Sequence, residues 1–196
     1  MPPITLVAHR LLPDQEDRPA ITDLAFATAP GGAETLYATT RYSGVLEAWS
    51  LEGGGLQRLA SVAHGRPDAA GSEPQIAFVA TGSGLAALTG GGHDGALSLR
   101  PLRADGSFAS RQTLGTPEAL AGDLAEAVTV TLGSGAQMVY GAMTGADGIA
   151  RLSFDAAGAL LGATRILGGG EVHSGRVAAV ATVEAGGRTW LLTAGS

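Results

Sequence analysis

The side chains with the clearest chemical potential are acidic residues just ahead of apolar, strand-like segments. Asp23, Glu73 and Glu126 each occupy such a position, and the segments that follow them recur at a regular spacing. Carboxylate oxygens are the ligands that calcium takes in proteins, and a cluster of carboxylates also attracts basic partners. If the segments meet around one opening, these three residues could converge on Ca²⁺ or on a basic ligand. The alternative is that they are ordinary polar residues of connecting loops.

A glycine motif at residues 81–87, Thr-Gly-Ser-Gly-Leu-Ala-Ala, follows an apolar segment and matches the pattern of a dinucleotide-binding turn. The corresponding places in other parts of the chain are residues 29–32, 133–135 and 185–187, which are also rich in glycine. Because the feature recurs, it predicts a structural turn between two strands rather than a nucleotide site.

The remaining candidate residues predict structure rather than catalysis. Asp-Gly pairs at 94–95 and 147–148 favour tight turns, in which both central residues need positive φ. No histidine has a second histidine or a carboxylate at the spacing of helical metal ligands, and no serine lies in a Gly-x-Ser-x-Gly motif. The histidines are His9, His64, His93 and His173.

The composition excludes several classes of protein. All 12 basic residues are arginine, and the chain has no lysine, cysteine or asparagine. P-loop and Schiff-base lysines, thiol nucleophiles, disulfides and cysteine-bound zinc are therefore excluded. The net charge of −6 and the scattered arginines argue against a nucleic-acid partner. No apolar run is long enough for a membrane helix and residues 1–12 lack the layout of a signal peptide, so we expect one ordered domain over residues 1–196 without a membrane span.

Internal repeats give the strongest structural signal. Apolar first runs begin at Leu24, Ile76, Val128 and Val177, which are 52, 52 and 49 residues apart. Three further runs separated by turns follow each of the first three, and the fourth runs are residues 56–62, 108–114 and 160–167. Four short strands joined by glycine turns are typical of an antiparallel β-propeller blade. Helical solenoids also have such periods, but no 3.6-residue periodicity extends far enough for a pair of helices.

The third run of each repeat gives an independent register. These runs open at Gly44, Gly95 and Gly148, and the residues two and four positions later are apolar, whereas most of the residues between them are polar. This alternation recurs in one register in three repeats and indicates a strand, because alternate side chains of a strand point to opposite faces. The apolar residues are Leu46 and Ala48, Leu97 and Leu99, and Ala150 and Leu152.

We therefore expect an all-β, β-propeller-like fold with about three and a half four-stranded antiparallel blades and a repeat of about 52 residues. Closed rings have about four to eight blades, so this count predicts part of a longer propeller or one half of an oligomeric ring closed through open blade edges. Residues 4–12 alternate like the fourth strand of a blade. The predicted blades span approximately residues 21–65, 73–116 and 125–170, with an incomplete blade at 174–196.

Trp49 is a large aromatic residue on the mostly polar face of its predicted strand. Exposed aromatic residues often anchor interfaces, so one interpretation is that Trp49 binds a partner. The other interpretation is that Trp49 packs between neighbouring blades, where both faces of a sheet are covered.

The opening stretch from Ile4 through Phe26, followed by residues 35–44 and 45–49, resembles the N-terminal region of alphaproteobacterial hemolysin-type calcium-binding proteins. The resemblance implies secretion by a type I system through a C-terminal signal, and an RTX calcium-binding β-roll after the propeller. The only similar glycine- and aspartate-rich segment here is residues 90–95, and a single copy predicts no β-roll. Without the resemblance, the lack of an N-terminal signal would predict a cytoplasmic protein.

The function that we expect is that of a non-catalytic recognition or scaffold β-propeller module of a secreted bacterial protein. Its partner would be a protein or a carbohydrate bound at a loop surface. One alternative is a propeller enzyme of the lactonase or phytase type, with Ca²⁺ held by acidic loop residues. A second alternative is a structural assembly protein that closes a ring by oligomerisation.

Overall fold

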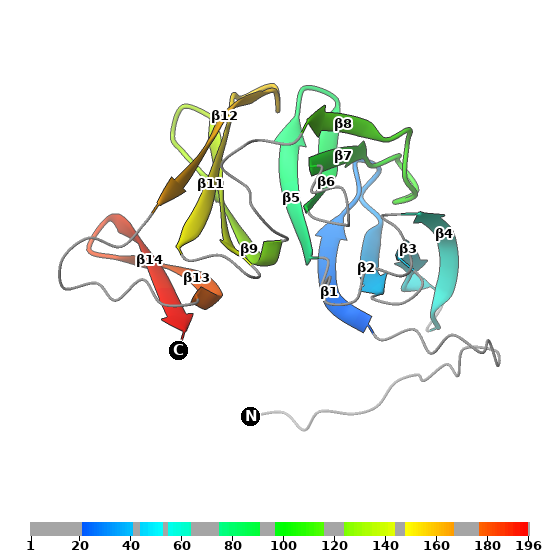
Figure 1. Ribbon diagram of the computed structural model, residues 1–196. Coiled ribbons are helices and arrows are strands. Elements are labelled where there is room, and N and C mark those ends of the chain that lie inside the picture. The colour runs from blue at the N-terminus through cyan, green and yellow to red at the C-terminus, as the bar shows by residue number, and fades with distance from the viewer. Residues whose placement is uncertain are drawn as a thin grey trace.

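The computed structural model shows an all-β chain with four antiparallel sheets (Figure 1). The described strands form no closed barrel. The all-β class is therefore confirmed, and the β-propeller-like arrangement of about three and a half blades stays a prediction. The structure describes residues 21–40, 44–52, 55–63, 75–90, 97–115, 124–143, 148–166 and 177–195.

Three sheets have the same topology, in which four consecutive strands pair in chain order, and the fourth sheet has two strands. Sheet 1 contains β1 (Ile21–Thr28), β2 (Glu34–Thr40), β3 (Val45–Ser50) and β4 (Gln57–Ala63). Sheet 2 contains β5 (Gln75–Thr81), β6 (Gly84–Gly90), β7 (Leu97–Pro101) and β8 (Gln112–Gly115). Sheet 3 contains β9 (Leu124–Thr131), β10 (Gln137–Met143), β11 (Ile149–Phe154) and β12 (Leu160–Ile166). Sheet 4 contains β13 (Val177–Ala185) and β14 (Arg188–Gly195).

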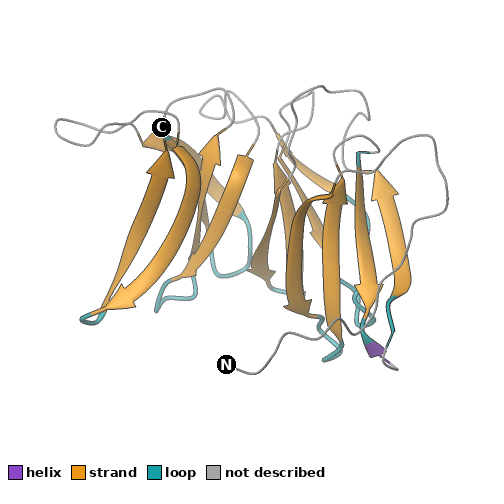
Figure 2. Cartoon of the chain, turned by 90° about the horizontal axis from the view of Figure 1, so that it is seen from below, coloured by secondary structure: helices purple, strands orange, loops and turns teal. Residues whose placement is uncertain are grey.

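Glycine sets the hairpin between the first two strands of each sheet, and the described hairpin loops gather at one end of the molecule (Figure 2). In sheets 1 and 3 the loop has five residues and closes through Gly32 and Gly135, which have φ of 87° and 82°. Only glycine adopts such φ values at no steric cost. In sheet 2 the turn is the two-residue Gly82-Ser83, which joins two antiparallel strands. The prediction that this motif is a structural turn is therefore confirmed.

The core lies between successive sheets, which pack face to face. We call the face of a sheet that points toward the preceding sheet its back face, and the opposite face its front face. Between sheets 1 and 2, the fully buried ring of Tyr37 contacts Phe78 edge-on at 5.2 Å between ring centroids, and its hydroxyl donates to the carbonyl of Gly106 at 2.9 Å. Desolvation by burial raises the pKa of Tyr37.

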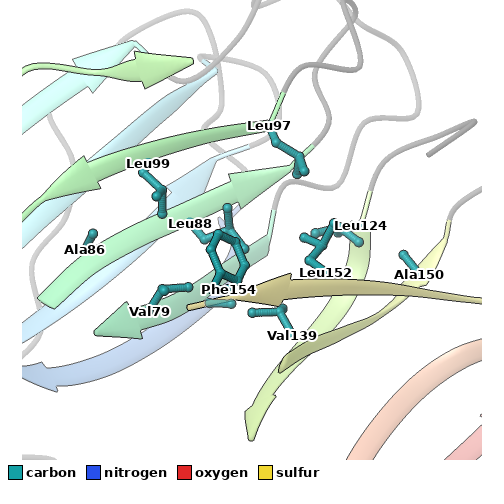
Figure 3. Packing of buried hydrophobic residues seen from close by; sticks show 11 residues of the cluster. Val79, Ala86, Leu88, Leu97, Leu99, Leu124, Val139, Ala150, Leu152 and Phe154 are labelled. Atoms are coloured by element: carbon teal, nitrogen blue, oxygen red, sulfur yellow. The ribbon is translucent and has the colours of Figure 1, made fainter. Parts of the chain in front are cut away.

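The second apolar cluster joins sheets 2 and 3 (Figure 3). Sheet 2 contributes side chains such as Val79 and Leu88, and sheet 3 contributes Val139, Leu152 and Phe154, all of them at most 1% exposed. Sheet 2 is thus covered on both faces. β13 of sheet 4 packs against β9 and β10 of sheet 3.

The predicted register of the third strands is correct for sheets 1 and 2 and wrong for sheet 3. Leu46 and Ala48 lie on the front face of sheet 1, and Leu97 and Leu99 on the front face of sheet 2. Ala150 and Leu152 instead lie on the back face of sheet 3, in the same cluster as Leu97 and Leu99.

The reason is that loop glycines do not mark equivalent strand positions. Gly44 stands two residues before Leu46, which pairs with Thr39, whereas Gly148 stands one residue before Ile149, which pairs with Ala142. A shift of one residue moves every side chain of a strand to the other face.

The end of sheet 2 also differs from the prediction. The fourth run was expected over residues 108–114, but β8 begins only at Gln112, and Phe108 forms an isolated bridge with Leu102. Phe108 still belongs to the apolar cluster between sheets 1 and 2. A tight turn precedes it, in which Asp105 accepts hydrogen bonds from the hydroxyl and the backbone N–H of Ser107. These bonds lower the pKa of Asp105.

The packing between sheets 2 and 3 can be tested with two leucines of sheet 3. Leu152 is 0% exposed in the cluster, whereas Leu161 is 69% exposed. Leu152→Ala should lower the free energy of unfolding by about 2–5 kcal/mol, because it removes buried methyl groups and leaves a cavity. Leu161→Ala should change it by less than about 0.5 kcal/mol. Urea unfolding of both variants measures the difference, and equal losses would contradict the stacking of the two sheets.

Candidate functional site

The first strand of every sheet is an edge strand. β1, β5, β9 and β13 each pair with one strand of their own sheet, and they lie next to one another along the inner border of the fold (Figure 1). Outward backbone groups of an edge strand have no ladder partner, although a buried backbone group needs one. Side chains of the neighbouring sheets fill this role here.

Two acidic residues of the predicted cation site are engaged in this way. Asp23 Oδ2 accepts a hydrogen bond from the backbone N–H of Ile76 at 2.8 Å. Glu126 Oε2 accepts one from the N–H of Val180 at 2.9 Å. Each carboxylate therefore joins one first strand to the first strand of the next sheet. Both residues lie within β1 and β9, not ahead of them as the sequence suggested.

The back face of sheet 3 makes the reverse connection. The Gln137 amide accepts from the N–H of Ala80 at 2.7 Å and donates to the carbonyl of Ala80 at 2.8 Å. The Thr129 hydroxyl donates to the carbonyl of Phe78 at 2.9 Å. The outward backbone groups of β5 belong to alternate residues, namely Ile76, Phe78 and Ala80. Side chains from sheets 1 and 3 therefore form hydrogen bonds with the backbone at three successive outward positions of this strand.

Sequence reasoning missed Gln137. Its only signal is a long polar residue at the start of an otherwise apolar strand, and that position alone does not show that the side chain reaches another sheet. The residue is 2% exposed, so these two hydrogen bonds with Ala80 are shielded from water.

A buried arginine links the third strand of sheet 2 to the fourth strand of sheet 1. Arg100, 9% exposed on β7, donates from Nη2 to the carbonyl of Ala63 at the end of β4, at 2.6 Å. Burial, and to a smaller extent the charge of Arg111, lowers the pKa of Arg100. The bond therefore satisfies a charge that packing has removed from water.

The predicted calcium site is described only in part. Glu73 and the four histidines lie outside the described residues. Within the described ranges no three His, Cys, Asp or Glu side chains come together in a group that could hold a metal ion. Asp23 and Glu126 contact different strands, β5 and β13. Calcium binding by Asp23, Glu73 and Glu126 stays a prediction, with two of the three carboxylates already engaged by backbone N–H groups.

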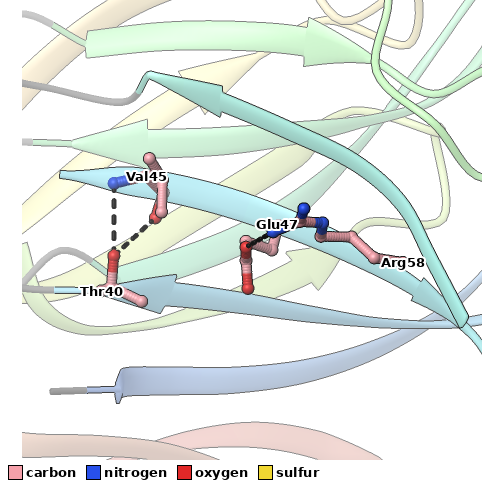
Figure 4. A network of polar contacts seen from close by, with 4 residues as sticks. All are labelled: Thr40, Val45, Glu47 and Arg58. Carbon is pink, nitrogen blue, oxygen red and sulfur yellow. Dashed lines mark hydrogen bonds and ion pairs between the residues drawn. The ribbon is translucent and has the colours of Figure 1, made fainter. Parts of the chain in front are cut away.

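Trp49 lies on the back face of sheet 1 and is 8% exposed. It lines an apolar groove of about 160 Å³ together with Leu24, Leu36, Ala38 and Leu56. The guanidinium of Arg58 lies 5.9 Å from the ring centroid of Trp49 and forms a 3.3 Å ion pair with Glu47 (Figure 4). Trp49 occupies a strand position whose equivalent in another sheet of the fold faces a neighbouring sheet. This favours the interpretation that Trp49 packs between sheets.

A second hollow lies at the hairpin end of the junction between sheets 2 and 3. It has a volume of about 240 Å³. The backbone N–H of Gly82 donates to the carbonyl of Ala157 at 3.0 Å and so ties its two walls together. Its polar groups are the hydroxyls of Thr81 and Ser83 and the amide of Gln112, which is exposed. The other lining residues are Gly82, Ala86, Leu99, Pro101, Ala157, Gly158 and Ala159.

The sequence matches no protein-family model and no curated protein. In the part of the chain that the structure describes, no helix has the length and apolar character required to cross a bilayer.

The role of Asp23 as a connection between strands can be separated from a role in metal binding. Asp23→Ala should lower the free energy of unfolding by about 1–3 kcal/mol, because the N–H of Ile76 loses its acceptor. Asp23→Asn retains an acceptor oxygen and should lose less. Both losses should be the same in EDTA and in millimolar calcium, as measured by urea unfolding. A loss that appears only with calcium would show instead that Asp23 acts as a metal ligand.

Proposed function

We propose that this chain is a non-catalytic recognition or scaffold module of a secreted bacterial protein, built from β-propeller blades. Three sheets with identical strand order, stacked in chain order with their first strands adjacent, support the propeller arrangement. The resemblance to hemolysin-type proteins is what supports secretion.

The observation that carries the recognition role is the hollow between sheets 2 and 3. Its lining combines hydroxyl and amide groups with the apolar surfaces of Leu99 and Pro101, and among the described residues it includes no carboxylate, imidazole or guanidinium. Such a lining can hydrogen-bond to a ligand and contact its apolar face, but it offers no general acid or base.

The chemistry of the hollow favours an uncharged polar ligand. Sugar hydroxyls and peptide amides both match its donors and acceptors. Its volume of about 240 Å³ lies just below the range of about 300–1,000 Å³ that is typical of sites for drug-sized molecules. We therefore expect the hollow to hold one sugar ring or one side chain of a larger carbohydrate or protein partner.

Two arginine substitutions on exposed hairpin residues test this proposal. Ala159→Arg places a long side chain in the hollow. Gly133→Arg is the matched control, because Gly133 lies in the β9–β10 loop, outside the hollow, and a Cβ there meets no neighbouring atom. Ligands identified on arrays of neutral glycans and of peptides would be titrated against both variants by calorimetry.

The expected result is a Kd for Ala159→Arg that is raised by about tenfold or more, with the Kd of Gly133→Arg unchanged from that of the wild type. Equal affinities of the two variants would place the binding surface elsewhere. An absence of ligands on both arrays would contradict the proposed recognition role.

A further inference from the structure

The two ends of the stack of sheets expose apolar side chains. On the back face of sheet 1, Leu24 and Phe26 are 54% and 64% exposed. On sheet 4, Val183, Trp190 and Leu192 are 43%, 52% and 53% exposed. Val183 pairs directly with Trp190, and alternation places both opposite to Val180, which is 2% exposed on the β13 strand that packs against sheet 3. The exposed apolar residues Val183, Trp190 and Leu192 therefore lie on the front face of sheet 4.

The front face of sheet 4 can be matched to the front face of sheet 2, because the first hairpins of the two sheets have the same geometry. Sheets 2 and 4 have the same two-residue turn, closed by the pairs Thr81–Gly84 and Ala185–Arg188. The second residue pair beyond the pair that closes the turn is Val79–Ala86 in sheet 2 and Val183–Trp190 in sheet 4, so these two pairs occupy equivalent positions. Leu88 of β6 and Leu192 of β14 each lie two residues further from the turn, so they are equivalent as well. In sheet 2 the three positions are at most 1% exposed, because sheet 3 covers them.

The same comparison applies to the back face of sheet 1. Sheets 1 and 3 share the five-residue loop, closed by Thr28–Glu34 and Thr131–Gln137. Counted from that loop, Leu36 and Trp49 of sheet 1 correspond to Val139 and Leu152 of sheet 3, which pair in the same way. Val139 and Leu152 are both 0% exposed, because sheet 2 covers them.

The chain thus carries both halves of the interface that it uses internally. Sheet 1 presents a back face without a preceding sheet among the described residues, and sheet 4 presents a front face without a following one. The 160 Å³ groove beside Trp49 and Leu36 offers room for one large apolar side chain, and Trp190 or Leu192 would supply it. An unrelated partner would need only one of these faces, whereas a second copy uses both.

We propose that the front face of sheet 4 of one copy packs on the back face of sheet 1 of a second copy, so that copies of this chain associate head to tail. Such an interface joins two different surfaces, and it produces a closed ring when the rotation between copies closes and an open filament when it does not. The proposal concerns the ends of the stack and does not depend on the hollow between sheets 2 and 3. Ala159→Arg should therefore leave association unchanged.

Light scattering after size exclusion, at low and high micromolar concentrations, tests the proposal. The wild-type chain should show a mass of at least twice 19.5 kDa at high concentration. Phe26→Glu and Trp190→Glu should each remain at the monomer mass, because each places a charge in one half of the interface. Leu161→Glu, at a similarly exposed apolar position of β12, is the control and should associate like the wild type. Circular dichroism and urea unfolding would show that each variant is folded.

Mixing the two variants distinguishes head-to-tail contact from contact between identical faces. Phe26→Glu retains an intact sheet 4 and Trp190→Glu retains an intact sheet 1, so an equimolar mixture should form a dimer at concentrations at which neither variant associates alone. A wild-type chain that stays monomeric at high micromolar concentration would overturn the proposal. So would a Trp190→Glu variant that associates normally, or a mixture that remains monomeric.

Discussion

The open edges of the first strands impose the constraint on which the rest of the structure depends. β1, β5, β9 and β13 each have one ladder partner, and their outward backbone groups lie along the crowded inner border of the fold. An unpaired buried N–H or C=O costs about 1–3 kcal/mol. Side chains from neighbouring sheets bond to these backbone groups and so remove that cost without adding a strand. The side chains are those of Asp23, Glu126, Thr129 and Gln137. Because each bond reaches a residue 51 to 57 positions away, satisfying the edges also fixes one sheet against the next.

This arrangement explains why the apolar residues lie where they do. With the first strands fixed, the broad faces of the sheets meet. Tyr37 fills the space between sheets 1 and 2, and Phe154 fills the space between sheets 2 and 3. Sheets 2 and 3 each pack against a sheet on both sides, whereas sheets 1 and 4 each expose one face. Association through those terminal faces would repeat between molecules the contact that already exists between successive sheets within one.

The sequence predicted the strands well because their signal is local. The first-run spacing and the glycine turns gave the position of nearly every strand, and the nucleotide-like motif at Gly82 was correctly interpreted as a turn. The prediction that the third strands share one register was wrong for sheet 3, because Gly148 lies in a loop, where its φ is 92°, and does not mark the pairing of the strand. The role of Asp23, and the importance of Gln137, could not be predicted, because both depend on which strand edge lies opposite in space.

Amide hydrogen exchange in the Gln137→Ala variant tests most directly whether side chains satisfy the open edges. Ala80 loses its side-chain partner in this variant, whereas Ile76, on the same strand, keeps Asp23. The Ala80 amide should therefore exchange about tenfold or more faster than in the wild type, while the Ile76 amide changes little. Unchanged protection of Ala80, or equal acceleration of both amides, would contradict the account.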